Sequence, residues 1–479
     1  MNLTTLLDMA ADGGDGRAAL TNGGDGVTAA DLRAAARHGA AVLMQSGAPA
    51  LVYLAKNGPA FPVALFAAAV AGVPFVPLNY RLGAEPLSAL LANHPRAYVV
   101  ADEQHDAVAR PVASGLTTPE AWLARTAKKV PGRPVREPAP DATAVVIYTS
   151  GTTSTPKPVS LRHDNLVSYV IGTVEFGSAG PDEASLSCVP PYHVAGVAGV
   201  LSNLYAGRRL VFLDPFTPRG WLDLVNAEQI TGAMVVPTML ARVMEDPGPV
   251  PSLRTLAYGG AAMPPRVIER ALREWPSVGF VNAYGLTETS STISVLGPDD
   301  HRDALASTDP KVRARLHSVG RPVPGVEIEI RDTDVLPAGE SGLIWVRGAQ
   351  VAAGGWFDTR DLGHLDADGY LFVEGRVDDT IIKGAENISP AEIEDVLRRQ
   401  DGVADAVVVG VPDDEWGQRI EAVVTPERGA EPDPELLREA VRLVLRGSRT
   451  PDRVTVWAEL PRTDTGKVRR RDVVATLCR

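Results

Sequence analysis

The stretch Tyr148-Thr-Ser-Gly-Thr-Thr-Ser-Thr-Pro-Lys-Pro-Val159 is rich in hydroxyl groups and carries one lysine, Lys157, near its end. The β-branched run 144–147 precedes it, so we expect a buried strand to lead into this loop. A glycine-containing turn can point backbone N–H groups at an anion, and hydroxyls and an ammonium group add further donors. The pattern predicts a phosphate-binding loop. A plain surface turn is the alternative, because the same residue types are common in loops.

Two common nucleotide-binding motifs do not fit this stretch. A Walker loop has glycine directly before its lysine and serine or threonine after it, whereas Lys157 lies between Pro156 and Pro158. No Gly-x-Gly-x-x-Gly opens a helix after the run 144–147 either. A phosphate loop of another kind is therefore predicted.

The composition indicates a soluble protein of several domains. A chain of 479 residues is too long for one compact core, and 45% hydrophobic residues supply at least two. The net charge of −12 argues against a nucleic-acid partner, so anionic substrates must be drawn in by local positive groups. Only Cys188 and Cys478 are present, which makes a disulfide scaffold or a cysteine metal site implausible and favours a reducing cytoplasm.

Neither a signal peptide nor a membrane span is expected. The N-terminal residues 1–8 contain no basic region and no sustained apolar core. The segment 57–80 lacks charged residues, but Pro62, Pro74 and Pro77 interrupt it, which predicts a buried helix followed by a short strand.

Apolar runs and amphipathic segments alternate along most of the chain. Before the phosphate loop the pattern predicts two helices, at 29–44 and 60–71, and three strands, at 50–54, around 75 and at 97–100. After it, strands are expected at 210–213, 233–236, 255–258 and 279–281, with a helix at 265–275. Such alternation is typical of layered α/β sheets, whose ligands bind at the carboxyl ends of the strands.

A smaller unit is predicted to begin at Arg376. Ser389, Pro390 and Glu392 are typical of a helix start with serine as its cap. Strands at 406–409 and 420–424 and a helix from 433 to about 445 complete an α+β unit. The prediction is a large N-terminal domain of layered α/β subdomains, 1–375, and a small mobile α+β C-terminal domain, 376–479.

Six further segments follow the phosphate loop in a fixed order. They are Pro190–Gly196, Tyr258–Ala261, Tyr284–Glu288, Thr359–Asp361, Glu374–Asp379 and Pro461–Lys467. Together with 148–159 they resemble the motifs of the adenylate-forming superfamily, which contains acyl-CoA synthetases, luciferases and the adenylation domains of peptide synthetases. The resemblance covers residues 148–467 and is nearest to the acyl- or aryl-CoA ligases.

The resemblance implies that ATP and Mg²⁺ bind at these motifs. Tyr284 would stack near adenine, Asp361 would hold the ribose hydroxyls, Arg376 would lie near the ribose and phosphate, and Thr287 would bind phosphate. Glu288 would hold Mg²⁺, which commonly binds through one or two carboxylates, water and the nucleotide. The other nucleotide-binding residues implied are Thr149, Ser150, Gly151, Thr152, Thr153, Lys157, Gly259, Gly260, Ala261, Asn282 and Gly285.

The resemblance also implies a reaction in two halves. Lys467 would reach the reacting carboxylate and the α-phosphate while acyl-AMP forms; the small domain would then rotate about Asp378, and a thiol would attack. Two unit charges 4 Å apart repel by about 4 kcal/mol at an effective dielectric constant near 20, so a carboxylate approaching ATP needs such cations. Gly384 matches the glycine past which the pantetheine of CoA threads.

Three positions depart from the family pattern. Ser154 and Pro158 stand where the phosphate loop of the family has glycines, and Pro158 also removes a backbone donor. Arg360 replaces the glycine of the family's Thr-Gly-Asp motif. The aspartate of that motif, Asp361, is retained, so its ribose-binding role is still expected.

The acyl pocket is expected to be small and apolar. His193 would line and gate it, and the other lining residues implied are Val194, Ala195, Val235, Val236 and Leu286. This set suits an aromatic or a short-to-medium aliphatic carboxylic acid. The segment 193–196 lacks the aspartate that amino-acid adenylation domains use to bind the substrate ammonium, which argues against an α-amino acid.

The leading hypothesis is a carboxylate:CoA ligase that acts through an acyl-adenylate. An acyl carrier protein, an amine or another nucleophile could replace CoA as the acceptor. A catalytically silent nucleotide sensor is a third possibility, against which the presence of Lys467 argues. The oligomeric state, monomer or homodimer, is left open.

Overall fold

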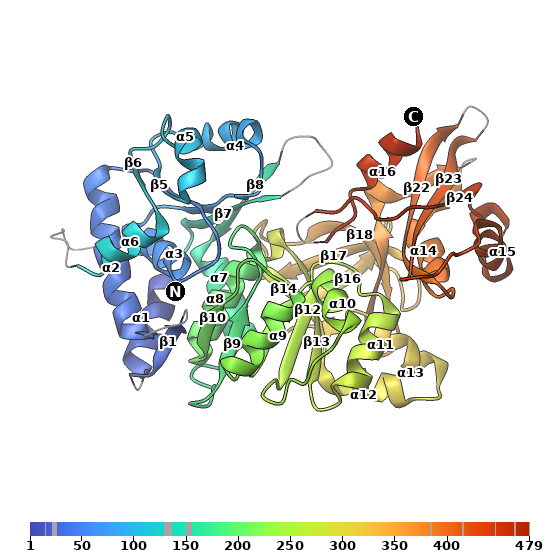
Figure 1. Ribbon diagram of the computed structural model, residues 1–479, viewed down its shortest axis with the longest axis horizontal. Coiled ribbons are helices and arrows are strands. Elements are labelled where there is room, and N and C mark those ends of the chain that lie inside the picture. The colour runs from blue at the N-terminus through green and yellow to red at the C-terminus, as the bar shows by residue number, and fades with distance from the viewer. Residues whose placement is uncertain are drawn as a thin grey trace.

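The structure is a computed structural model in which a large N-terminal domain carries a smaller C-terminal domain at one end (Figure 1). It describes residues 1–14, 16–21, 26–128, 137–149, 156–383, 386–413, 416–445, 447–463 and 466–478. Within the described residues, no helix combines the length and the apolar character that crossing a membrane would require.

A six-stranded sheet built around the predicted phosphate-loop strand forms the first layer of the large domain. Its strands, in spatial order, are β6 (Gly115–Thr117), β5 (Tyr98–Ala101), β3 (Leu51–Leu54), β4 (Phe75–Pro77), β7 (Thr143–Thr149) and β8 (Lys157–Arg162). All neighbours are parallel except β7 and β8, which form an antiparallel hairpin at the sheet edge. The predicted β-α-β arrangement is therefore confirmed.

A nine-stranded sheet forms the second layer. Its order is β15 (Arg321–Pro322), β14 (Ser291–Leu296), β13 (Gly279–Leu286), β12 (Thr255–Gly259), β11 (Gly232–Val235), β9 (Ala184–Ser187), β10 (Arg209–Phe212), β1 (Ala18–Thr21) and β2 (Val27–Thr28). The strands from β13 to β1 run parallel, so their carboxyl ends meet at one edge.

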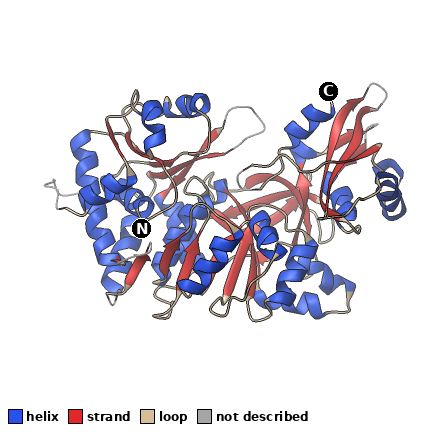
Figure 2. Cartoon of the chain, in the orientation of Figure 1, coloured by secondary structure: helices blue, strands red, loops and turns tan. Residues whose placement is uncertain are grey.

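Apolar helices lie between and around the two sheets (Figure 2). One buried cluster joins both sheets, with Leu51 of β3 and Leu210 of β10 packed against Phe66 of α3 and Val200 of α8. The helices of the large domain are α1 (Leu3–Gly13), α2 (Ala29–Ser46), α3 (Ala60–Ala71), α4 (Ala84–Leu91), α5 (Asp106–Ala109), α6 (Pro119–Thr126), α7 (His163–Thr173), α8 (Val194–Ala206), α9 (Pro218–Ala227), α10 (Pro237–Glu245), α11 (Pro265–Glu274), α12 (Pro298–Ala306) and α13 (Pro310–Ala314).

A four-stranded antiparallel sheet leads from the large domain to the small one. It consists of β16 (Val326–Arg331), β17 (Gly342–Gly348), β18 (Phe357–Leu365) and β19 (Leu371–Arg376). The small domain contains β20 (Ile381–Lys383), β21 (Glu386–Ile388), α14 (Pro390–Arg398), β22 (Val403–Asp413), β23 (Gly417–Pro426), α15 (Pro434–Val444), β24 (Arg453–Val456) and α16 (Arg470–Leu477). The predicted α+β content of this unit is confirmed.

Two local predictions are wrong in an informative way. A short strand was expected at 279–281, but β13 continues to Leu286, and so includes Tyr284, because β14 folds back and pairs with it. Ser389 precedes α14 as predicted, yet its hydroxyl makes no capping bond and donates instead to the carbonyl of Glu374, at 2.7 Å. The serine thus ties the helix start to the chain entering the small domain.

Candidate active site

Tyr284, Asp361 and Arg376 form a bonded cluster at the end of the nine-stranded sheet. The hydroxyl of Tyr284 donates to Asp361 Oδ2 at 2.6 Å, and Arg376 Nη1 lies 3.2 Å from Asp361 Oδ1. The side chain of Asp361 is only 8% exposed, so its charge depends on these partners. The structure therefore brings together three side chains that are widely separated in the sequence and that the motifs had predicted for the nucleotide.

Burial and charge act in opposite directions on this carboxyl. Loss of solvent raises the pKa of Asp361, while Arg376, the Tyr284 hydroxyl and Lys467 oppose the shift. The pKa of Tyr284 is raised well above its usual range, first by burial and then by the charge of Asp361. Tyr284 is therefore a hydrogen-bond donor at neutral pH, and Asp361 retains acceptor sites suited to hydroxyl groups.

Lys467 reaches this cluster from the small domain. Its backbone is held in a tight turn, in which Thr463 N donates to Lys467 O at 2.7 Å and Gly466 N donates to Thr463 O at 2.8 Å. The pKa of Lys467 is lowered, first by loss of solvent and next by Arg376, while Asp361 and Glu288 oppose the change. Lys467 keeps exposed surface, so water softens each of these effects.

The turn before Lys467 packs directly on the large domain. Gly466 has a φ of +80°, and a β-carbon there would lie 2.2 Å from Thr238 Oγ1 on α10. Arg462 stabilises the turn, because its Nη1 donates to Gly466 O at 2.6 Å while its Nη2 pairs with Asp405. Sequence reasoning assigned no role to Arg462, although its place inside the lysine motif was a signal.

The two predicted glycines, Gly259 and Gly260, are required for different structural reasons. A β-carbon on Gly259 would lie 2.2 Å from the carbonyl oxygen of Ala283, so glycine is needed there for β12 to approach β13. Gly260 has a φ of +84° and faces Val236, since a β-carbon on it would lie 4.0 Å from Val236 Cγ1. Ala261 follows as a half-buried residue.

Glu288 and Thr287 lie in a short 3-10 helix, Thr287–Thr289, directly after β13. Both are half-buried, and Glu288 acts electrostatically on Lys467. Asn282, predicted for the nucleotide, donates from Nδ2 to the carbonyl of Ser318 at 3.2 Å, and Gly285 lies beside a bulge between β13 and β14. Glu288 is thus a half-buried carboxylate directly after the end of β13.

The predicted acyl-pocket residues gather around the start of α8 and the end of β11. His193 precedes α8, with its ring packed 4.5 Å from that of Tyr192, and Val194 and Ala195 open the helix half-buried. Val235 is 1% exposed within the apolar core of the nine-stranded sheet, whereas Val236 faces Gly260. Leu286 is half-buried at the end of β13.

The predicted phosphate loop spans the β7–β8 hairpin. Thr149 ends β7 and pairs in register with Lys157, which begins β8 and is exposed. Pro158 occupies an edge strand, where a missing backbone donor is tolerated. Ser150, Gly151, Thr152, Thr153 and Ser154 lie outside the described residues, as does Gly384.

Asp378, the predicted hinge residue, forms an ion pair with Arg360. Arg360 Nη2 lies 2.7 Å from Asp378 Oδ1, and Arg360 N donates to Asp358 Oδ1 at 2.8 Å. Arg360 has a φ of +61°, a left-handed conformation that costs an ordinary residue about 1–2 kcal/mol. Position 360, where the family pattern predicts glycine, is therefore left-handed and carries a charged side chain that reaches the predicted hinge residue.

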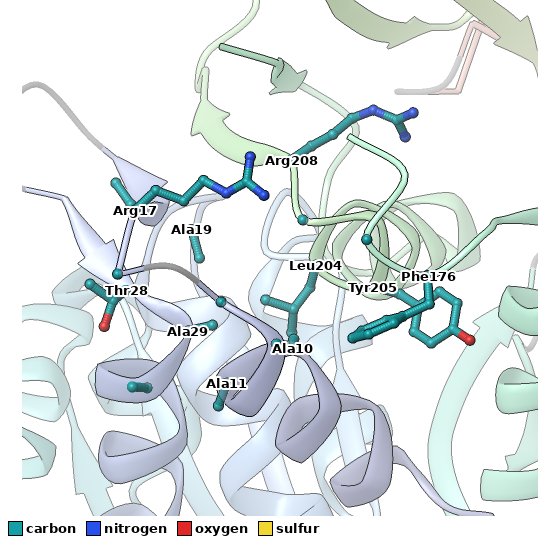
Figure 3. A pocket seen from close by; sticks show the side chains of 17 residues that line it. Ala10, Ala11, Arg17, Ala19, Thr28, Ala29, Phe176, Leu204, Tyr205 and Arg208 are labelled. Atoms are coloured by element: carbon teal, nitrogen blue, oxygen red, sulfur yellow. The ribbon is translucent and has the colours of Figure 1, made fainter. Parts of the chain in front are cut away.

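A separate cavity of about 190 Å³ lies between α1, α2 and the end of α8 (Figure 3). Alanine and glycine line much of it, with Phe176 and Tyr205 on one side and Arg17 and Arg208 at its rim. Among the described residues, none of those predicted for the nucleotide or the acyl group lines it. The candidate active site is therefore the strand-end cluster and not this cavity.

Comparison with known proteins identifies the family of the chain. Residues 7–356 match the family of AMP-binding enzymes, and residues 392–467 match the AMP-binding enzyme C-terminal domain. A feruloyl-CoA synthase of an Amycolatopsis species is 32% identical over 95% of both chains. ATP-bound MatB of Rhodopseudomonas palustris superposes with a TM-score of 0.86 at 27% identity over 99% of both chains. The amide bond synthetase McbA of Marinactinospora thermotolerans superposes with a TM-score of 0.87 at 30% identity, also over 99% of both. The chain belongs to the family of AMP-binding enzymes.

Proposed function

We propose that this enzyme is an ATP-dependent carboxylate:CoA ligase. A carboxylate oxygen attacks the α-phosphorus of ATP, the bond to the β-phosphate breaks, and acyl-AMP and pyrophosphate form. The sulfur of CoA then attacks the acyl carbon, and AMP leaves. The observation that carries the proposal is the arrival of Lys467, from the small domain, beside Glu288 and the bonded cluster of Tyr284, Asp361 and Arg376.

Each group in this arrangement suits one part of ATP. Asp361 accepts bonds from the ribose hydroxyls, and the ring of Tyr284 lies beside adenine. Thr287 and the hairpin with Lys157 hold the phosphates. Glu288 would hold Mg²⁺, which screens phosphate charge when bound. Lys467 offsets the repulsion between the incoming carboxylate and the α-phosphate, so positioning and electrostatics replace a covalent enzyme nucleophile.

We further propose that the domains divide at residues 375 and 376 and that the small one turns about Asp378 between the two half-reactions. The two family matches leave 357–391 between them, and the proposed boundary falls inside this interval. Gly384 would then line the route of pantetheine.

The proposed substrate is an aromatic or a short-to-medium aliphatic acid. The side chains at the start of α8, at Val236 and at Leu286 are apolar, which suits such a tail and offers it no charge. The similarity to a feruloyl-CoA synthase supports the aromatic choice.

An amide-forming enzyme is the second candidate, because the chain is as similar in structure to an amide bond synthetase as to MatB. In that case an amine nitrogen, and not a thiol sulfur, would attack acyl-AMP. A carrier-protein thiol is a third possible acceptor that leaves the first half-reaction unchanged.

Purified protein with ATP and Mg²⁺ should be given a panel of aromatic and aliphatic acids, alone and with CoA, an acyl carrier protein or simple amines. Mass spectrometry then follows acyl-AMP, thioester and amide. We expect acyl-AMP from an aromatic acid alone and acyl-CoA once CoA is added, with neither product from Lys467→Ala. Acyl-AMP that reacts only with amines would transfer the assignment to the second candidate. No acyl-AMP with any acid would overturn both.

A further inference from the structure

Arg266, on α11 of the large domain, reaches across to the small domain. Its Nη1 lies 2.8 Å from Glu427 Oε1, and its Nη2 lies 3.2 Å from Asp401 Oδ1. The same Nη2 donates to the carbonyl oxygens of Arg399 and Gln400, at 3.0 and 2.9 Å. A single guanidinium thus bonds two carboxylates and two carbonyls of the other domain.

These partners form one compact corner of the small domain. The carbonyls of Arg399 and Gln400 directly follow α14, where a helix leaves unpaired carbonyls and a partial negative charge. Glu427 joins the same corner, because its backbone N donates to the carbonyl of Gly402 at 2.8 Å. A planar guanidinium fits such a set, whereas an ammonium cannot bond several of these acceptors in the same fixed directions.

The corner belongs to the same domain that carries Lys467 into the active site. None of the bonds made by Arg266 involves a residue of the nucleotide cluster. The turn at Gly466 meets Thr238 of α10, so the small domain touches the large one separately at the lysine turn and at the α14 corner. Two separated contacts fix an orientation, whereas one contact alone would allow pivoting.

We propose that Arg266 is a positioning residue for acyl-adenylate formation, which holds the small domain in the orientation that delivers Lys467 and releases it for the second half-reaction. This rests on the proposed function for the role of Lys467 in adenylate formation and for the existence of a second half-reaction. Arg266 touches no substrate; it acts through the placement of Lys467. Its loss should therefore affect the two half-reactions unequally.

The test uses Arg266→Ala, Arg266→Lys and, as a matched control, Arg270→Ala. Arg270 lies on the same helix and forms an ion pair with Glu274, also of α11. Adenylate formation is followed by exchange of labelled pyrophosphate into ATP, and thioester formation is started from supplied acyl-AMP. Melting temperatures establish that each variant is folded.

Domain orientation is measured apart from activity. Cys478 is exposed and Cys188 buried, so a dye on Cys478 and a second dye on Ser88→Cys of α4 report the distance between the domains by energy transfer. We expect Arg266→Ala to slow adenylate formation about fivefold to thirtyfold, the range of a modest coupling, and to broaden the transfer distribution. Arg266→Lys should fall between it and the wild type, and Arg270→Ala should change neither measurement.

Equal losses in both half-reactions, or a transfer distribution identical to that of the wild type, would overturn the proposal. If Arg266→Ala does not fold, Glu427→Gln removes one carboxylate partner of the same arginine and serves as the second variant. If CoA is not the acceptor, the wild type itself forms no thioester, while pyrophosphate exchange and energy transfer still test Arg266.

Discussion

The nucleotide cluster and the contacts of the small domain are built in opposite ways. Asp361 is 8% exposed and is bonded by Tyr284 of β13 and by Arg376, the last residue of β19. The ion pairs that hold the small domain are open to water, with Arg266 40% exposed and Arg360 56% exposed. Buried bonds of the first kind are costly to break, whereas exposed pairs contribute about 0–1 kcal/mol each.

This difference separates a permanent site from a conditional one. Tyr284, Asp361 and Arg376 all precede Asp378, the proposed pivot, so we expect this cluster to keep its geometry when the small domain turns. Under the proposed domain rotation, Lys467 would join the cluster only while several weak contacts hold together. A set of weak contacts suits a domain that must leave, because it can be broken one contact at a time.

The largest effect is expected from Lys467→Ala, which removes the conditional part and leaves the permanent one. Adenylate formation should fall about 10²- to 10³-fold, the usual loss when one group that stabilises the transition state is removed. Thioester formation from supplied acyl-AMP should stay near the wild-type rate. Pyrophosphate exchange measures adenylate formation, and detection of acyl-CoA measures thioester formation. Arg471→Ala, which changes an exposed neighbour, is the control. Equal loss of both steps would contradict the division.

The second-largest effect is expected in the pH dependence of adenylate formation, because the pKa of Lys467 is lowered. The ammonium is present below its pKa and is lost as pH rises through it. Adenylate formation should therefore decline on the alkaline side at a lower pH than the usual lysine value of about 10.4 permits. Above the pKa of Lys467, the rate of adenylate formation should fall about tenfold for each further pH unit. Lys467→Arg should remove this decline, because guanidinium stays charged, even if the rate is lower. A decline unchanged in Lys467→Arg would assign it to another group.

Tyr284→Phe tests the permanent cluster with a smaller change. It removes the 2.6 Å bond to Asp361 and keeps the ring. We expect the KM for ATP to rise about tenfold, equivalent to about 1.4 kcal/mol. The acid side of the profile should also move to higher pH, because loss of this bond raises the pKa of Asp361 further. An unchanged KM for ATP would place the ribose elsewhere.

The smallest effect is expected at Arg360. Arg360→Ala removes the exposed pair with Asp378 and should slow adenylate formation less than about fivefold. Arg360→Gly should in addition relieve about 1 kcal/mol of left-handed strain and melt at a higher temperature than Arg360→Ala. Combining Arg360→Ala with Asp378→Asn should add nothing to either single change, if the pair is the cause. Fully additive losses would show that Arg360 and Asp378 act independently and not through their ion pair.

Local patterns predicted the elements of this fold, and long-range contacts escaped them. The helix expected at 60–71 is α3 with the same bounds, because an apolar run ending in glycine leaves little choice. The length of β13 was missed, since it depends on pairing with β14, which no local pattern shows. Motifs located Tyr284, Asp361 and Arg376, whose bonds the structure then supplied. Arg266 carries no motif, and its partner Glu427 lies 161 positions away.

The meeting of Gly466 and Thr238 bears on how the enzyme can be engineered. Two conditions exclude a side chain at 466: the left-handed backbone, which belongs to the turn itself, and the hydroxyl of Thr238, which is present only while the domains touch. Thr238 follows β11, next to the residues that we assign to the acyl pocket. A library that enlarges position 238 to alter substrate range would therefore also press against the lysine turn. A variant selected at position 238 for binding a new acid can fail to adenylate that acid, because the larger side chain displaces the lysine turn. Positions 238 and 466 are therefore best varied together.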